Sequence, residues 1–75
     1  MTHYQQQIIK ATGCKESDTH EIEEYMREIV LHSTLDWLTI TQFNKAARTA
    51  WKDIQWMRSP EGIKYMEELE QSMLN

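Results

Sequence analysis

Residues 39–57 read TITQFNKAARTAWKDIQWM and predict the longest amphipathic helix of the chain. Thr39 suits the N-cap, and Gln42 three residues later completes a capping-box pattern. Leu38 and Phe43 occupy the two positions of a hydrophobic staple at the same helix start. The helix is therefore placed at 40–57, and one apolar arc of it is expected to form the core of the fold. That arc contains Ile40, Phe43, Ala46, Ala47, Ala50, Trp51, Ile54 and Met57.

The opposite face of this helix is basic and carries one large aromatic residue. Lys45, Arg48 and Lys52 cluster on it, and Trp56 lies one turn beyond Lys52. An exposed tryptophan leaves a large apolar surface in water unless something covers it. Three alternatives could cover Trp56. The first is another part of the same chain: the first helix, the last helix or the chain end. The second is a protein partner or a second copy, and the third is nucleic acid, which would stack on the aromatic ring between the flanking cations. These four residues are the candidate partner-binding site.

Two helices are predicted before the central one, at about residues 2–12 and 19–32. A capping box is expected at the start of each, from Thr2 and from Asp18. Gly13 suits the left-handed position that ends the first helix. The second helix has apolar residues at i, i+3, i+4, i+7 and i+8, which predicts one buried face. Those residues are Ile22, Tyr25, Met26, Ile29 and Val30.

The last helix is predicted at about 60–73, with Ser59 as the N-cap and Pro60 at the first helical position. Its apolar residues are expected to face inward. Glu70 falls among them on the helical wheel, so its carboxylate calls for a Lys or Arg from another helix or another subunit. The expected inward residues are Ile63, Met66, Leu69 and Met73.

The connection before the central helix is unusually apolar. Burying Leu35, Trp37 and Leu38 would stabilise the fold by about 1.5–3 kcal/mol each, so these residues are expected to fold back over the core. The chain has two glycines and one proline, too few for the tight turns of a sandwich or barrel. The whole sequence, residues 1–75, therefore predicts a single all-α domain built as a small bundle of four helices.

Charge and cysteine content limit the classes of protein to consider. The net charge of −4 argues against simple adhesion to nucleic acid or to an anionic membrane. Cys14 is the only cysteine, which excludes an intrachain disulfide. It is expected to be a small buried residue, with a reactive thiol or an intersubunit disulfide as the alternative. The longest apolar run, residues 29–31, is too short for a membrane helix, and a cytoplasmic location is expected.

No catalytic residues, metal or cofactor are predicted. Glu24, Glu28 and His32 are spaced by four and form one candidate metal or acid–base set. The Glu-x-x-His pairs of diiron bundles are absent from the sequence. The favoured interpretation is therefore that the two glutamates are solvated and that His32 lies at the edge of the core. His32, Ser33 and Asp36 include the residue types of a catalytic triad, but a triad is assembled by geometry and not by closeness in sequence.

The expected function is a non-enzymatic interaction protein: an acidic adaptor, inhibitor or accessory subunit that occupies a partner's surface. Self-association, for example as a homodimer, is expected because the core of a 75-residue chain is marginal. The alternative is a small helix-turn-helix-like regulator that binds nucleic acid with the basic face of helix 40–57. The acidic segments at 16–28 and 61–70 make nucleic acid the less favoured partner.

Overall fold

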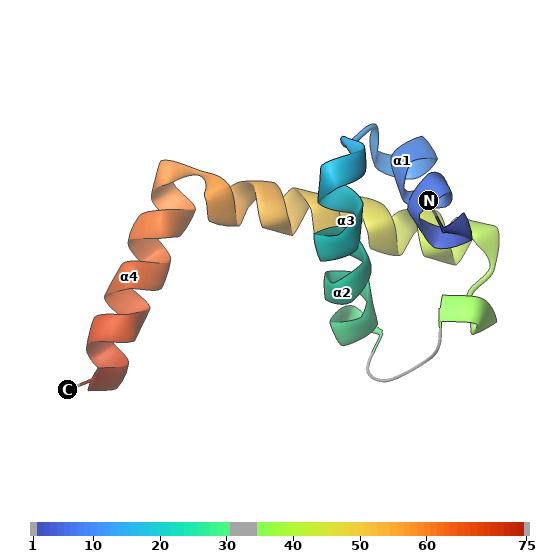
Figure 1. The fold of residues 1–75 in the computed structure, drawn as a ribbon. Coiled ribbons are helices and arrows are strands. Elements are labelled where there is room, and N and C mark those ends of the chain that lie inside the picture. The colour runs from blue at the N-terminus through green and yellow to red at the C-terminus, as the bar shows by residue number, and fades with distance from the viewer. Residues whose placement is uncertain (1, 31–34, 75) are drawn as a thin grey trace.

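The computed structural model describes residues 2–30 and 35–74, and this part of the chain is all-α (Figure 1). The predicted bundle of four helices is confirmed. Short 3₁₀ helices precede the second and third α-helices. The elements are α1 (His3–Thr12), η1 (Glu16–Asp18), α2 (Thr19–Ile29), η2 (Leu35–Trp37), α3 (Ile40–Arg58) and α4 (Pro60–Leu74). The second helix thus ends at Ile29, before the predicted end at 32, which lies outside the described residues.

The core forms where α1 and α2 pack on α3, which confirms α3 as the central helix. Ala47 and Ala50 are both fully buried, and their small side chains allow neighbouring helices to approach closely. Apolar side chains from all three helices and from η2 fill the remaining space. The buried core residues are Ile8, Cys14, Ile22, Met26, Leu35, Phe43, Ala47, Ala50 and Ile54.

Local capping explains where α1 and α3 begin. The Thr2 hydroxyl accepts the backbone N–H of Gln5, and the Gln5 side chain accepts the Thr2 N–H at 2.9 Å. Thr39 and Gln42 form the same reciprocal pair at the start of α3. Gly13 follows α1 in the left-handed conformation, with a φ of 72°. These boundaries are the ones that the sequence predicts.

The capping box predicted at the start of α2 is wrong. Asp18 lies in a helical conformation and makes no side-chain cap. Its carboxylate instead accepts a 3.1 Å hydrogen bond from the Arg58 guanidinium, and Glu21 binds the same guanidinium. A tertiary ion pair has therefore replaced the local cap, because η1 brings the start of α2 beside the end of α3.

Polar and aromatic contacts tie α1 to the first half of α3. The ring of Tyr4 stacks on Phe43, with 5.8 Å between centroids and 18° between the planes. One turn along α1, the Gln7 amide donates a 2.7 Å hydrogen bond to the Asn44 side chain. These contacts fix the rotation of α1 about its own axis.

The connection before α3 is only partly buried. Leu35 is 2% exposed, as expected, but Trp37 is 85% exposed, which contradicts the expected burial. The reason is the 3₁₀ geometry of η2, in which residues three apart share a side. Leu38 therefore follows Leu35 toward the core, while Trp37 points into solvent. Ile40 was also expected in the core and is 60% exposed, at the first turn of α3.

A tight turn joins α3 to α4. Ser59 has extended backbone angles, and its hydroxyl accepts the Gly62 N–H at 3.1 Å, so the predicted N-cap is confirmed. Gly62 is buried against α3, and a Cβ atom at this position would overlap the carbonyl oxygen of Trp56. The close approach of the two backbones sets the direction in which α4 leaves α3.

The expectation that the apolar residues of α4 face inward is wrong. α4 packs on the end of α3 and extends away from the core of α1, α2 and α3 (Figure 1). The turn at Ser59 and Gly62 directs the helix outward, so its apolar residues stay outside the buried core of the described residues. Ile63, Met66, Leu69 and Met73 are between 42% and 79% exposed.

Candidate interaction surface

The four residues predicted to bind a partner lie exposed on one face of α3. Lys45, Arg48 and Lys52 form no ion pair with any residue of the described ranges, 2–30 and 35–74. The acidic helices of the chain therefore do not neutralise this face. The cation of α3 that does form ion pairs in the described residues is Arg58, which binds Asp18 and Glu21 and lies 5.5 Å from the ring of Trp51.

Trp56 is partly covered by its own chain. Its ring lies 5.7 Å from the ring of Tyr65 in α4, with a tilt of 59° between the planes. This contact agrees with the interpretation in which the last helix packs over the indole. Trp56 nevertheless remains 44% exposed, so the contact leaves room for a further molecule.

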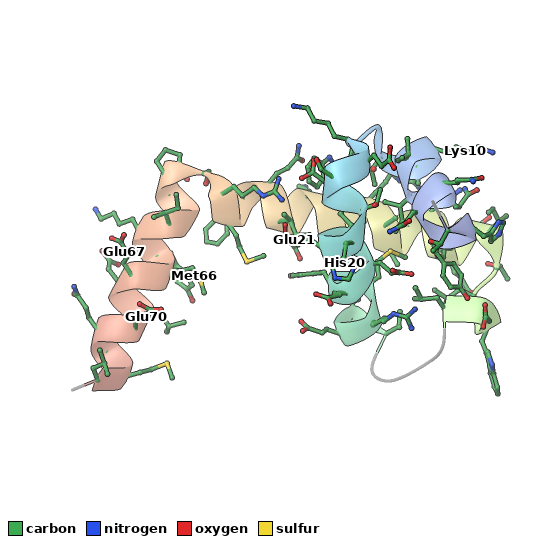
Figure 2. The ribbon with its side chains drawn as sticks, in the orientation of Figure 1. Lys10, His20, Glu21, Met66, Glu67 and Glu70 are labelled. Carbon is green, nitrogen blue, oxygen red and sulfur yellow. The ribbon has the colours of Figure 1, made fainter. Side chains whose placement is uncertain are left out.

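α4 carries more than half of the exposed large apolar residues of the described chain, four of which were predicted to face inward. Six of the ten exposed large hydrophobic residues of the described chain lie on it. At about 100° per residue they share an arc of about 180°, and the other side of the helix is polar. Figure 2 shows Met66 and Glu67 on opposite sides of α4, with Met66 on the side that faces α2. The six residues are Ile63, Tyr65, Met66, Leu69, Met73 and Leu74.

Glu70 lies inside this apolar arc, as its position in the sequence predicts. It forms no ion pair within residues 2–30 and 35–74. A partner that covers the arc must therefore desolvate this carboxylate or supply a cation to it. The expected Lys or Arg opposite Glu70 therefore remains a prediction about a partner, because Glu70 itself is exposed.

A shallow apolar groove lies between α2 and the N-terminal half of α3, away from α4. Its volume is about 300 Å³, at the lower end of the range for ligand sites. Lys45 lies in its wall, so the groove borders the basic face of α3. The lining residues are Ile29, Val30, Leu38, Gln42, Lys45, Ala46 and Thr49.

A second hollow, of about 180 Å³, lies between α1, η2 and α3 and is smaller than typical small-molecule sites. Its walls combine apolar and polar side chains without any cluster of charged groups. The lining residues are His3, Tyr4, Gln7, Leu35, Asp36, Leu38, Ile40 and Phe43.

Both candidate sets of catalytic or metal-binding residues include His32, which the described part of the chain does not cover. No group of three or more His, Cys, Asp or Glu residues there has the arrangement of a metal site. Ser33 also lies outside the described residues, and Glu24 pairs with His20 at 3.1 Å, with both side chains exposed. Cys14 is buried in the core, in agreement with its expected structural role.

No helix within the described ranges has the length and apolar character needed to cross a lipid bilayer. No protein-family model, curated protein or solved structure shows significant similarity to this chain.

Proposed function

We propose that this protein is a non-enzymatic interaction module, an adaptor, inhibitor or accessory subunit, whose binding element is the apolar face of α4. The observation that supports this is the exposure of six large apolar side chains on one helix. Isolated contiguous apolar patches of this kind mark binding surfaces in soluble proteins. A cytoplasmic location remains part of the proposal, and the single cysteine is consistent with it.

The architecture of α4 fits recognition by insertion of an amphipathic helix into a groove. In this mode the anchors lie at i, i+3, i+4 and i+7 spacings on one face. Ile63, Met66 and Leu69 have spacings of three, with Met73 four residues on. Methionine and aromatic side chains are enriched in such interfaces, and Tyr65 with Trp56 extends the apolar surface onto α3.

Stability provides a second reason for α4 to bind a partner. A helix of 15 residues is marginal in water when it is isolated, because most helical stability in proteins comes from packing of the apolar face. Within the described ranges, Gly62 and Tyr65 in the first turns of α4 contact the end of α3, whereas the large apolar residues farther along the helix are exposed. Covering the rest of its apolar face would therefore stabilise both the helix and the complex.

The nucleic-acid alternative rests on one observation, the exposed Lys45, Arg48 and Lys52. Three phosphate contacts would make binding about 40-fold weaker between 50 and 200 mM salt. The alternative is the weaker one, because Arg58 is occupied by two carboxylates and α4 is acidic. A gel-shift titration at both salt concentrations, with single- and double-stranded DNA and RNA, decides between the two functions.

The decisive comparison for the proposed function uses Leu69→Glu and Gln71→Glu. Both variants add the same side chain to an exposed position of α4, but only Leu69 belongs to the apolar arc. Burying a leucine in an interface stabilises it by about 1.5–3 kcal/mol, so Leu69→Glu is expected to weaken binding at least tenfold. Gln71→Glu should bind like the wild type.

The measurement is made on purified protein, first for self-association and then for each protein that the tagged wild type captures. Circular dichroism checks that both variants remain helical. Equal dissociation constants for the two variants and the wild type, across every interaction found, would show that α4 is not the binding element.

A further inference from the structure

The molecule is less compact than a self-contained domain of its size. Its accessible surface is 5781 Å², about 900 Å² more than expected for a compact monomer of 9.0 kDa. Its radius of gyration is 14.0 Å, against about 11 Å for a compact chain of 75 residues. One side of a standard protein interface buries about 800 Å², so the excess surface equals the surface that one stable contact would remove.

The chain also contains a site that matches α4. The groove between α2 and α3 is apolar and offers Lys45 at its edge, whereas α4 offers an apolar arc that contains Glu70. Each of these two ions lacks an ion-pair partner in the described part of the chain. The two surfaces also have opposite net charge. α4 carries four glutamates and one lysine, whereas the groove borders the basic face of α3.

An α4 helix cannot reach the groove of its own chain. The groove lies along the N-terminal half of α3, while α4 is fixed to the C-terminal end by the turn at Gly62 (Figure 1). A twofold axis perpendicular to α3 that passes near its middle and runs roughly along the direction of α4 would place two α3 helices antiparallel, with both α4 helices on the same side. Each α4 would then lie beside the groove half of the other copy, and the two contacts would be identical, as in an isologous dimer.

From these observations we infer that the partner of α4 is a second copy of this chain. The two copies exchange their α4 helices: each apolar arc lies in the other copy's groove between α2 and α3, and each Glu70 pairs with the other copy's Lys45. This inference rests on the proposed function, in which α4 is the binding element. It adds the identity of the partner, the groove that receives α4, and the ion pair that fixes the position of α4 along that groove.

A charge-exchange experiment tests the inference. Lys45→Glu and Glu70→Lys are each made alone, and both positions are exposed, so the fold is retained. In either variant alone, a dimer brings like charges together at both contacts, and its dissociation constant should rise about tenfold or more. In an equimolar mixture the two variants restore both pairs, so a heterodimer of near wild-type affinity should form. The readout is sedimentation velocity, with one variant fluorescently labelled.

The results separate this inference from the proposed function. Recovery of the heterodimer on mixing supports the exchange of α4. A wild-type chain that stays at 9.0 kDa up to high micromolar concentration overturns the inference. So does a dimer that tolerates both charge reversals, since its interface would lie elsewhere. In either case, another protein whose capture is lost in Leu69→Glu would leave α4 as the binding element, with a different partner.

Discussion

The rings of Trp56 and Tyr65 lie 5.7 Å apart, and this contact joins the end of α3 to the first turns of α4. It is the aromatic contact that holds the exposed helix to the rest of the molecule within the described ranges. Tilted aromatic pairs of this kind contribute about 0.5–1.5 kcal/mol beyond the area that they bury. The position of α4 thus depends on a small number of contacts at one end of the helix.

A double-mutant cycle of Trp56→Ala and Tyr65→Ala should measure this contact. Each single variant is expected to leave the core of α1, α2 and α3 intact, because both residues are exposed and lie outside it. The coupling free energy from urea unfolding should be about 0.5–1.5 kcal/mol. Strictly additive effects would mean that the rings do not interact in solution.

Replacement of Gly62 by alanine should destabilise the protein, although the same change usually stabilises a helix by about 0.5–1 kcal/mol. The added methyl group would overlap the Trp56 carbonyl oxygen, which belongs to the main chain and cannot rotate away. The expected loss in the free energy of unfolding is about 1–3 kcal/mol. Ser72→Ala, at an exposed position of the same helix, is the control and should be neutral or slightly stabilising. A stabilised Gly62→Ala variant would show that the two backbones are further apart than described.

Loss of the Arg58 guanidinium should lower the melting temperature in a salt-dependent way. Arg58→Met removes the ion pairs to Asp18 and Glu21 and also the contact of the guanidinium with the Trp51 ring, while it keeps an unbranched apolar side chain at this position. Because exposed pairs are screened by salt, the difference from the wild type should shrink as salt is raised from about 20 mM to about 500 mM. Lys52→Met, which removes a cation without an ion pair in the described residues, should change the melting temperature little. A difference that is the same at both salt concentrations would contradict an electrostatic origin.

Stability should fall at alkaline pH through Tyr25. Its hydroxyl donates a 2.9 Å hydrogen bond to Asp53, and this bond, with smaller contributions from burial and nearby carboxylates, raises the pKa of Tyr25 above its ordinary value of 10.0. Folding therefore favours the neutral phenol. The resulting stabilisation is complete below the unfolded-state pKa of about 10 and is lost as the pH rises through the higher folded-state pKa.

Tyr25→Phe tests this titration. At neutral pH the variant should be less stable by about 0.5–1.5 kcal/mol, the net contribution of a typical hydrogen bond. Its urea midpoint should then fall less than that of the wild type between pH 9 and 11. Tyr4→Phe is the control, since the Tyr4 hydroxyl makes no hydrogen bond in the described residues. Identical pH profiles for wild type and Tyr25→Phe would rule out the linkage.

Local patterns in the sequence predicted the features that neighbouring residues decide. The capping boxes at Thr2 and Thr39, the glycine end of α1 and the apolar arc of α3 depend on residues within a few turns of one another. Long-range contacts decided the rest. The Asp18 cap was displaced by Arg58, which lies 40 residues away, and no local rule predicts that pairing.

The exposure of the apolar face of α4 also depends on long-range contacts, so local patterns did not predict it. Its apolar periodicity correctly predicted an amphipathic helix, but periodicity does not say which molecule the apolar face contacts. The tight packing at Gly62 turned the helix outward. The sequence did contain a signal, because a glutamate within the apolar arc calls for a cation that the adjoining helix does not supply. Lys45, Arg48, Lys52 and Trp56 were placed correctly on one exposed face, whereas four exposed apolar residues of α4 were assigned to the core.

Hydrogen–deuterium exchange of α4, measured as a function of chain concentration, tests most directly whether a second copy covers this helix. Peptides from residues 63–73 should exchange rapidly at low micromolar concentration, because a helix of this length with an uncovered apolar face is marginal. At high micromolar concentration they should become at least about tenfold more protected, together with the groove residues near Lys45, while α1 stays unchanged. Exchange in α4 that is the same at every concentration would contradict the exchange of α4 between copies.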